Sequence, residues 1–137
     1  MTLEEAEDSV LAQLPRFGFF LGPFGGGFQQ LNEFLNSVLT QNNQIGAVAG
    51  SPHRAFWSSL TYQQFTTGNV PGVNPPVPIL VVGKSAQSNI ILSLKGSGPF
   101  FDPNTGTYGQ MPANGPPFFT EAQVAEIAGW IDAGCPQ

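Results

Sequence analysis

Frequent glycine and proline residues limit how long any regular element of this chain can be. The 137 residues include 17 glycines and 13 prolines, spread over most of the length. Both residue types destabilise helix interiors, and proline also lacks a backbone N–H donor. The sequence therefore predicts short helices joined by long loops, within a chain the size of one ordinary domain.

Charged side chains are scarce, and their scarcity excludes two classes of partner. They make up 9% of the chain, against about a quarter in typical domains. Nine of the charged residues are acidic and four are basic. Nucleic acids and anionic membrane surfaces are both bound through patches of cations. In addition, no apolar run approaches the length of a membrane span. We expect an acidic domain with no nucleic-acid partner and no membrane span.

The chain has one cysteine, Cys135, and one histidine, His53. A lone cysteine excludes an intramolecular disulfide and a cysteine-based zinc site, and a lone histidine excludes a multi-histidine metal site. Cys135 follows the predicted end of the last helix, where the helix dipole opposes a reactive thiolate. No pair of carboxylates resembles that of a glycosidase. The sequence thus provides no metal site and no catalytic residue, and it leaves open whether the protein is an enzyme.

Apolar spacing and helix-capping signals predict where the helices lie. Thr2 with Glu5 and Thr120 with Gln123 form capping boxes, which mark helix starts. Asp132 lies near the end of the last helix, where its charge is unfavourable, so we expect a partner such as Arg54. Periodic apolar residues and these signals predict helices over 2–14, 29–40, 51–60, 62–67, 85–95 and 120–133, with loops over 41–50, 69–78 and 97–119 and an extended segment over 79–82.

A phenylalanine- and glycine-rich segment spans residues 16–28. Exposed aromatic clusters mark binding surfaces, although such a segment can also pack on its own domain. As a binding surface it would dock a protein partner, an apolar small molecule or another copy of the chain. The aromatic residues of this candidate ligand or partner surface are Phe17, Phe19, Phe20, Phe24, Phe28 and Trp57.

Three segments resemble, in order and in spacing, the second half of a bacterial c-type cytochrome domain. VVGKSAQSNIILSLKG resembles the family's connection and third helix, GQMPANGPPF the loop that carries the axial methionine, and FTEAQVAEIAGWIDAGCP the C-terminal helix. The resemblance covers residues 29–137 and is strongest after residue 83. It implies a mainly α fold, a cytochrome-c-like bundle of short helices with long Gly/Pro loops. Residues 1–28 would form an N-terminal extension, a helix plus the Phe/Gly segment.

The resemblance also implies an exported or periplasmic origin. The acidic start of the chain, however, is not a secretory signal, because such signals begin with basic residues.

The resemblance fails where haem would be attached. Covalent c-type haem requires the motif Cys-x-x-Cys-His, but Ala49 and Pro52 stand at the two cysteine positions before His53. Covalent haem is therefore excluded on chemical grounds. The resemblance still aligns His53 and Met111 with the family's two axial ligands, and His/Met ligation permits haem to bind without thioether bonds. Otherwise, His53 would be a histidine hydrogen-bonded to the backbone, and Met111 a core methionine.

The composition favours a protein without a cofactor. An empty haem crevice is costly, and the chain has 12 phenylalanines to fill one. We therefore predict that at least some of Phe17, Phe19, Phe20, Phe24 and Phe28 are buried against the loop near Met111 and the helix that starts at His53. The expected function is a haem-free cytochrome-c-like module for binding or structure, associated with a redox enzyme. The alternatives are a non-covalent haem or metal-binding electron-transfer protein that uses His53 and Met111, and a small cofactor-free enzyme with its pocket in the former crevice.

Overall fold

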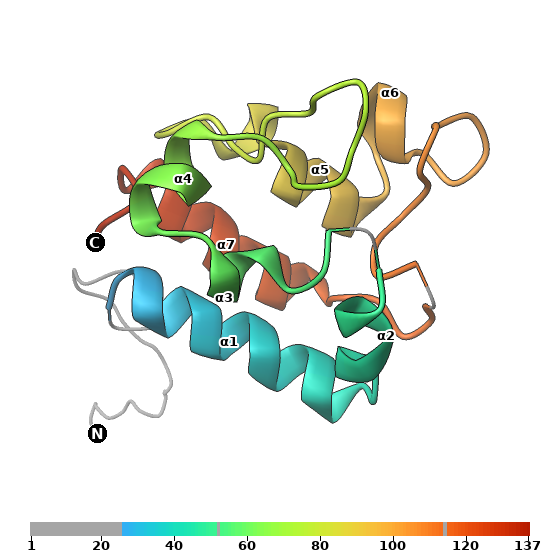
Figure 1. Ribbon diagram of the computed structural model, residues 1–137, viewed down its shortest axis with the longest axis horizontal. Helices are drawn as coiled ribbons and strands as arrows, with labels where there is room; N and C mark the ends of the chain where they lie inside the picture. The colour runs from blue at the N-terminus through green and yellow to red at the C-terminus, as the bar shows by residue number, and fades with distance from the viewer. Residues whose placement is uncertain (1–25, 52, 114) are drawn as a thin grey trace.

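The computed structural model describes residues 26–51, 53–113 and 115–137, and it is mainly helical (Figure 1). Within these ranges the only β pairing is an isolated bridge between Asn69 and Pro78. None of the described helices is both long and apolar enough to cross a membrane. The predicted helix over 2–14 lies outside the described residues. The helices are α1 (Phe28–Gln41), α2 (Ile45–Ala49), α3 (Phe56–Ser59), α4 (Tyr62–Thr67), the 3-10 helix η1 (Ser85–Gln87), α5 (Asn89–Lys95), α6 (Gly98–Phe101) and α7 (Glu121–Asp132).

Capping boxes at Thr61 and Thr120 start α4 and α7. The hydroxyl of Thr61 accepts a hydrogen bond from the backbone N–H of Gln64 at 3.1 Å, and the Gln64 side chain accepts one from Thr61 N at 2.9 Å. Thr120 and Gln123 repeat this exchange at 3.1 and 2.8 Å. Each box satisfies backbone donors that have no partner inside the helix. The predictions of these two helix starts are confirmed.

The region around residues 41–60 differs from the prediction in two ways. The expected loop over 41–50 contains α2, and the expected helix over 51–60 is reduced to α3. The hydroxyl of Ser51 accepts a hydrogen bond from Arg54 N at 3.0 Å, which forms a local turn instead of a helix start. Arg54 then takes φ 54°, a left-handed conformation that interrupts a right-handed helix. The helix therefore begins only at Phe56.

Buried Ser88 divides the helix that was predicted over 85–95 into η1 and α5. Its backbone is extended, with φ −88° and ψ 125°, and its side chain is fully buried. The hydroxyl accepts a hydrogen bond from Val81 N at 2.9 Å and donates one to the Lys84 carbonyl at 2.9 Å. The extended segment 79–82 is thereby held against the start of α5. The structure also differs from the prediction over 97–119, where α6 interrupts the expected loop.

A hydrogen-bonded junction joins η1 to the end of α7. Asp132 accepts from the backbone N–H and from the hydroxyl of Ser85, both at 2.9 Å, and Gly83 N donates to the Ile131 carbonyl at 3.0 Å. The predicted partner of Asp132, Arg54, was therefore wrong. Asp132 is held by uncharged donors, which offset its unfavourable place at a helix C-terminus.

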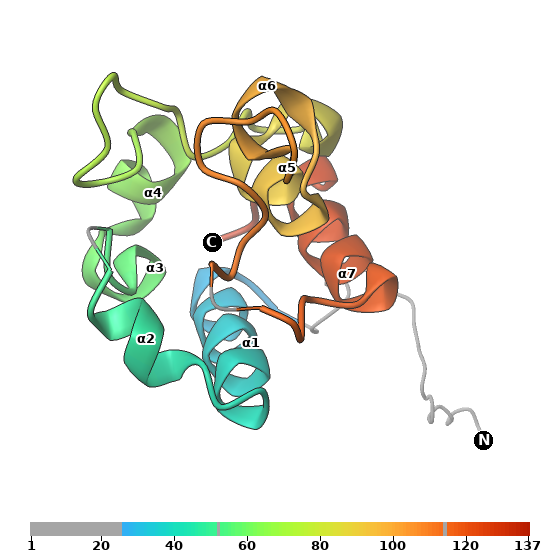
Figure 2. The same cartoon turned by 90° about the vertical axis from the view of Figure 1, so that its right-hand side faces the viewer.

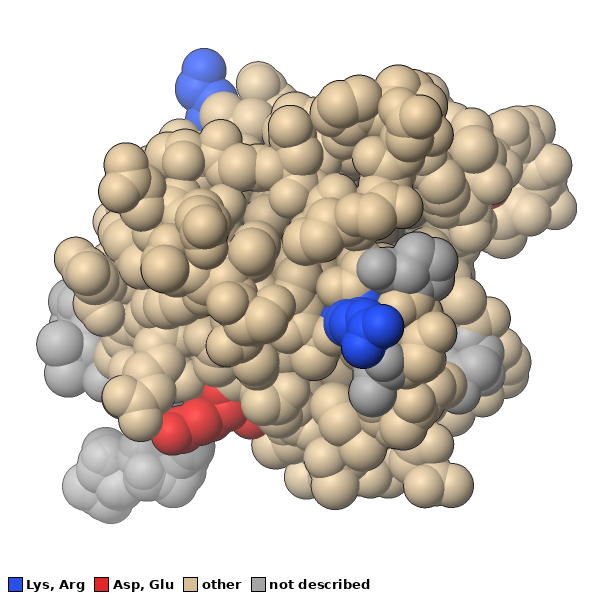
Figure 3. All heavy atoms as spheres, viewed as in Figure 1, with Lys and Arg blue, Asp and Glu red and all other residues tan. Residues whose placement is uncertain are grey.

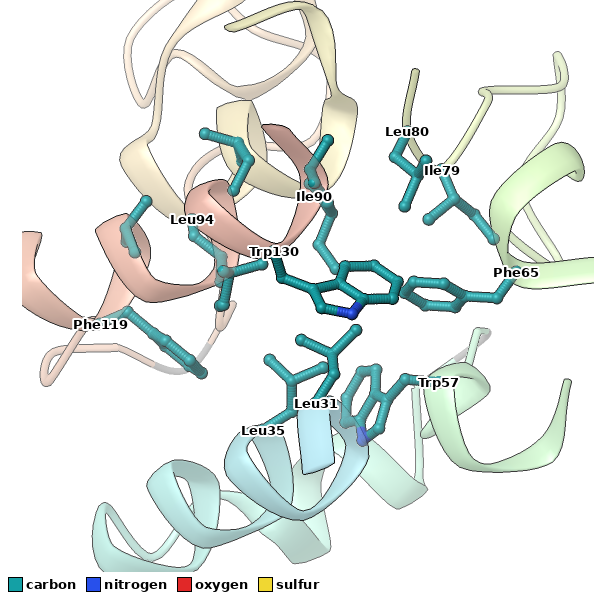
Figure 4. Close-up of a cluster of buried hydrophobic side chains, with 14 of the residues drawn as sticks. Leu31, Leu35, Trp57, Phe65, Ile79, Leu80, Ile90, Leu94, Phe119 and Trp130 are labelled. Atoms are coloured by element: carbon teal, nitrogen blue, oxygen red, sulfur yellow. The ribbon is translucent and has the colours of Figure 1, made fainter. Parts of the chain in front are cut away.

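The core is built around Trp130 of α7 (Figure 4). This side chain is fully buried, and its indole N–H donates to the Pro136 carbonyl at 2.9 Å. Figure 4 shows Leu31 and Leu35 of α1 on one side of the indole and Phe65 of α4 beside it. Because apolar side chains of α1, α3, α4, α5 and α7 meet in one buried cluster, these short helices stabilise one another by packing.

Most of the helices fall into two groups on opposite sides of the molecule. Figure 2 shows α2, α3 and α4 on one side of the molecule and α5, α6 and α7 on the other. The start of α1 lies beside the C-terminus, because Phe28 N donates a hydrogen bond to the carbonyl of Gln137 at 3.3 Å.

Candidate functional site

An apolar crevice lies between the two groups of helices. It consists of a smaller lobe of about 170 Å³ and a larger lobe of about 350 Å³. The two lobes share part of their lining, so they meet along a common wall. The shared wall includes Ser51, His53, Phe56, Ile90, Ser93 and Met111.

The smaller lobe is walled by buried side chains of the first three helices. Leu35 and Leu39 come from α1, Val48 from α2 and Trp57 from α3, while Phe119 closes the lobe from the loop before α7. The indole N–H of Trp57 donates to the Asn36 side chain at 2.8 Å, so its polar group is satisfied. The ring of Trp57 therefore contributes apolar surface.

The larger lobe is lined largely by two segments that were predicted to be loops, 69–78 and 97–119. Val70 and Val77 line it from the proline-rich connection after α4, and Ile79 from the extended segment that follows. Phe101 and Tyr108 line it from the region of α6, and their ring centroids lie 6.0 Å apart. Sequence reasoning missed both aromatic residues, because the segment 97–119 has no helical periodicity. The available signal was its length, since a long loop in a compact domain often lines a site.

Charged side chains are absent from the described lining of both lobes. The face of the molecule in Figure 3 also carries few charged atoms, as the low charge content of the sequence requires. A carboxylate or phosphate ligand would find no described cation against it in the crevice. The lining therefore favours an uncharged ligand.

His53 lies at the shared wall, and its hydrogen bond assigns its tautomer. The Nδ1 atom is 2.6 Å from the backbone carbonyl of Arg54. Because a carbonyl oxygen only accepts, Nδ1 carries the proton in the neutral ring, and Nε2 has the free lone pair. Nε2 makes no hydrogen bond within the described part of the chain. The ring edge also meets Phe56, at a centroid distance of 5.3 Å.

Met111 also lies at the shared wall, and its loop is fixed to α5. Met111 N donates to the Ser93 carbonyl at 2.8 Å, and the amide of Gln110 donates to the Leu94 carbonyl at 3.1 Å. The side chain of Met111 is half-buried and packs against the core cluster. The structure therefore brings His53 and Met111, 58 positions apart in the sequence, to the same crevice.

Comparison of this chain with known protein families, with curated proteins and with solved structures gives no match.

The donor atoms of the crevice fit a haem bound without covalent attachment. An imidazole and a thioether line the same two lobes, and this pair is a known axial set for haem iron. Most of the remaining lining is apolar, as a porphyrin face requires, with Ser51 and Ser93 as the other polar side chains of the shared wall. No cysteine stands at positions 49 and 52 to form thioether bonds. Within the described ranges no cluster of three or more His, Cys, Asp or Glu side chains is placed to hold a bare metal ion.

Of the predicted aromatic binding surface, only Phe28 and Trp57 lie in the described residues; Phe17, Phe19, Phe20 and Phe24 lie outside them. Trp57 lines the smaller lobe, as stated above. Phe28 lines neither lobe. Its ring instead meets Phe65 and Trp130, at centroid distances of 5.2 and 6.4 Å. Phe28 therefore does not fill the crevice; it packs against the core because α1 begins beside the C-terminus.

Cys135 is fully buried and lies away from the crevice lining. Burial raises the pKa of its thiol from 9.0 to about 11, and a backbone hydrogen bond from Gly83 opposes this only partly. A thiol that keeps its proton is a poor nucleophile. Cys135 therefore has a structural role, as the sequence indicated.

We expect the free energy of unfolding to fall as the pH rises from 9 towards 11. The unfolded thiol ionises from about pH 9.0, while the folded thiol keeps its proton until about 11, so the folded state loses stability over this interval. Urea denaturation at pH 8, 9, 10 and 11 measures the effect. A Cys135→Ala variant shows how much of the pH dependence comes from the titration of tyrosine and lysine side chains. Parallel pH profiles of the two proteins would contradict the prediction.

Proposed function

We propose that this protein is a haem-free, cytochrome-c-like module that binds an uncharged, apolar small molecule in the crevice. One observation carries the proposal. The two apolar lobes, of about 170 and 350 Å³, meet at one wall and have no charged side chain in their described lining. Open apolar surface costs about 25 cal/mol for each Å² that stays wet, and a bound apolar molecule removes that cost. The larger lobe reaches the size range of small-molecule sites.

Three structural features support the cytochrome-c-like part of the proposal. The fold is a set of short helices around a core centred on α7. The segments that carry the resemblance also contact one another, through Ser85 and Asp132 and through Met111 and Ser93. In that family the corresponding crevice encloses a large apolar group, and here the crevice is lined as such a site would be.

Ser93→Phe tests the proposal by filling the shared wall. Ser93 lines both lobes, and its hydroxyl donates only to the Ile90 carbonyl three residues earlier, at 2.8 Å. Ser37 makes the same type of bond, to the Phe34 carbonyl at 3.3 Å, but lies exposed on α1. Ser37→Phe is thus a matched control. The probe is the uncharged fluorophore N-phenyl-1-naphthylamine, followed by its emission increase.

We expect the wild-type protein and Ser37→Phe to bind the probe equally well. Ser93→Phe should bind it at least about tenfold more weakly, because the new ring occupies the volume where the lobes meet; tenfold corresponds to about 1.4 kcal/mol. Circular dichroism and urea denaturation of both variants show whether the fold is kept. Absence of binding to the wild type, or equal binding by a folded Ser93→Phe, would overturn the proposal.

Non-covalent haem is a second candidate, favoured by the shared position of His53 and Met111 on the wall of both lobes. Nε2 of His53 would be the nitrogen ligand, because Nδ1 is held by the Arg54 carbonyl. Bound haem would supply one-electron transfer. Titration with haemin distinguishes the candidates. A stoichiometric Soret band that His53→Ala and Met111→Leu each alter supports haem, whereas a weak band that neither variant alters supports the haem-free module.

A further inference from the structure

Hydrogen-bond donors and acceptors are unequally distributed on the shared wall of the crevice. Its three polar side chains are those of Ser51, His53 and Ser93. The hydroxyl of Ser51 donates to the Val48 carbonyl at 2.7 Å, and that of Ser93 donates to the Ile90 carbonyl at 2.8 Å. Both hydroxyl protons are therefore committed to the protein's own backbone. What remains available on these groups is lone pairs.

His53 also donates its side-chain proton to a backbone carbonyl and keeps a lone pair available. Its Nδ1 proton is directed to the Arg54 carbonyl at 2.6 Å, which leaves Nε2 as an acceptor with no described partner. Ser51 Oγ already accepts from Arg54 N at 3.0 Å, so Nε2 is the more open of the two acceptors. Nitrogen of a neutral imidazole is also a stronger acceptor than a serine hydroxyl that is held by the backbone. Where the lobes meet, the side-chain protons of the wall are all donated to backbone carbonyls, so these side chains offer a ligand only hydrogen-bond acceptors.

From this distribution we infer that the ligand of the crevice is an uncharged aromatic alcohol, of the phenol or quinol class, whose hydroxyl donates to Nε2 of His53. This inference rests on the proposed function, because it assigns the chemistry of the molecule that the crevice binds. A ligand with only acceptor groups, such as an ether or a ketone, finds no side-chain donor on the shared wall and leaves Nε2 unpaired. An anion finds no described cation in either lobe.

The aromatic body of the ligand follows from the rest of the lining. Phe56 lies at the shared wall, Trp57 and Phe119 in the smaller lobe, and Phe101 and Tyr108 in the larger one. Aromatic walls favour flat rings, which they contact face-on or edge-on. The larger lobe alone also has side-chain donors, namely the Tyr108 hydroxyl and the amides of Asn74 and Asn89, and the Asn89 amide already donates to the Pro78 carbonyl at 2.8 Å. These donors leave the distribution on the shared wall unchanged.

A matched pair of probes isolates the hydroxyl. 1-Naphthol and 1-methoxynaphthalene have the same ring system, and only the first has a proton to donate. Binding of each is measured by equilibrium dialysis to the full chain, to His53→Leu and to Ser37→Leu, which changes an exposed site on α1. We expect the wild type and Ser37→Leu to bind 1-naphthol about three- to tenfold more tightly than its methyl ether, as one net hydrogen bond provides.

His53→Leu should remove this preference by weakening naphthol binding while the methyl ether still binds, which also shows that the crevice is intact. The outcomes separate the two proposals. If neither probe binds the wild type, the proposed function fails. If both bind the wild type equally, or if His53→Leu keeps the preference for naphthol, the crevice binds apolar molecules but the inference about His53 is wrong.

Discussion

Replacing Trp130 with alanine should lower the free energy of unfolding by about 3–5 kcal/mol, the range for deleting a large buried aromatic side chain. Trp130 is fully buried at the centre of the cluster that joins α1, α4 and α7 (Figure 4). Its removal leaves a cavity between helices that are too short to be stable alone. Since small domains have only about 5–15 kcal/mol of stability, this substitution removes a large fraction of it. Urea denaturation followed by far-ultraviolet circular dichroism measures the loss.

Trp130→Phe is the control for this prediction. Phenylalanine keeps most of the apolar volume but lacks the N–H that donates to the Pro136 carbonyl at 2.9 Å. We expect a loss of about 1–2 kcal/mol, from one unsatisfied carbonyl and a small remaining void. If Trp130→Ala lost less than about 1 kcal/mol, the side chain would not be at the centre of the core, and the packing of α7 against α1 described above would be wrong.

Phe65→Ala should have an effect of similar size, about 3–5 kcal/mol, and should also weaken ligand binding. The Phe65 ring is fully buried and meets Phe28, Trp130 and Phe56 at centroid distances of 5.2, 6.2 and 6.0 Å. Phe56 lines both lobes of the crevice, so it loses its stacked neighbour when Phe65 is removed. We therefore expect a lower urea midpoint together with weaker binding of N-phenyl-1-naphthylamine by the fraction that stays folded.

Phe65→Leu is the matched variant, because leucine fills part of the volume at the same site. It should keep more stability and more probe binding than Phe65→Ala. A Phe65→Ala protein that is destabilised but binds the probe as tightly as wild type would show that Phe56 is held by its other neighbours. One of these is Trp57, at a centroid distance of 5.2 Å.

Local signals explain why parts of the fold were predictable. Thr61 and Thr120 start α4 and α7 because a threonine and a glutamine three residues later satisfy each other's backbone donors. The apolar face of α1 was likewise visible, since Leu31, Leu35 and Val38 recur at helical spacing and are all buried. In each case the information lies within one or two turns of the chain.

Other elements depend on contacts that a linear reading does not contain. Ser51 followed by Pro52 is a common helix start, but the Ser51 hydroxyl instead forms a turn with Arg54, and α3 begins later. Similarly, the buried amide of Gln44 donates to the Pro117 carbonyl at 2.7 Å, which ties the corner before α2 to the loop before α7. A link across 73 positions has no signature in either segment.

Only part of the candidate site was predictable from the sequence. The resemblance to c-type cytochromes aligned His53 and Met111 with the two axial haem ligands of that family, and both residues line the same crevice. The prediction that phenylalanines of the N-terminal segment fill the crevice rested on composition, and composition does not specify where a ring packs. Phe28 packs against the core, and the larger lobe takes its rings from Phe101 and Tyr108, within a segment without periodicity.

The junction between Ser85 and Asp132 has a consequence for how the molecule opens. Together with the bond from Gly83 to Ile131, it fixes residues 83–95 to the end of α7, and the Met111 loop is bonded to α5 within the same block. Such a block behaves as one cooperative unit in amide hydrogen exchange. The walls that α2 and α3 contribute to the crevice lie outside it. We therefore expect a ligand to enter and leave the crevice when α2 and α3 are transiently displaced, while the wall that contains Met111 keeps its shape.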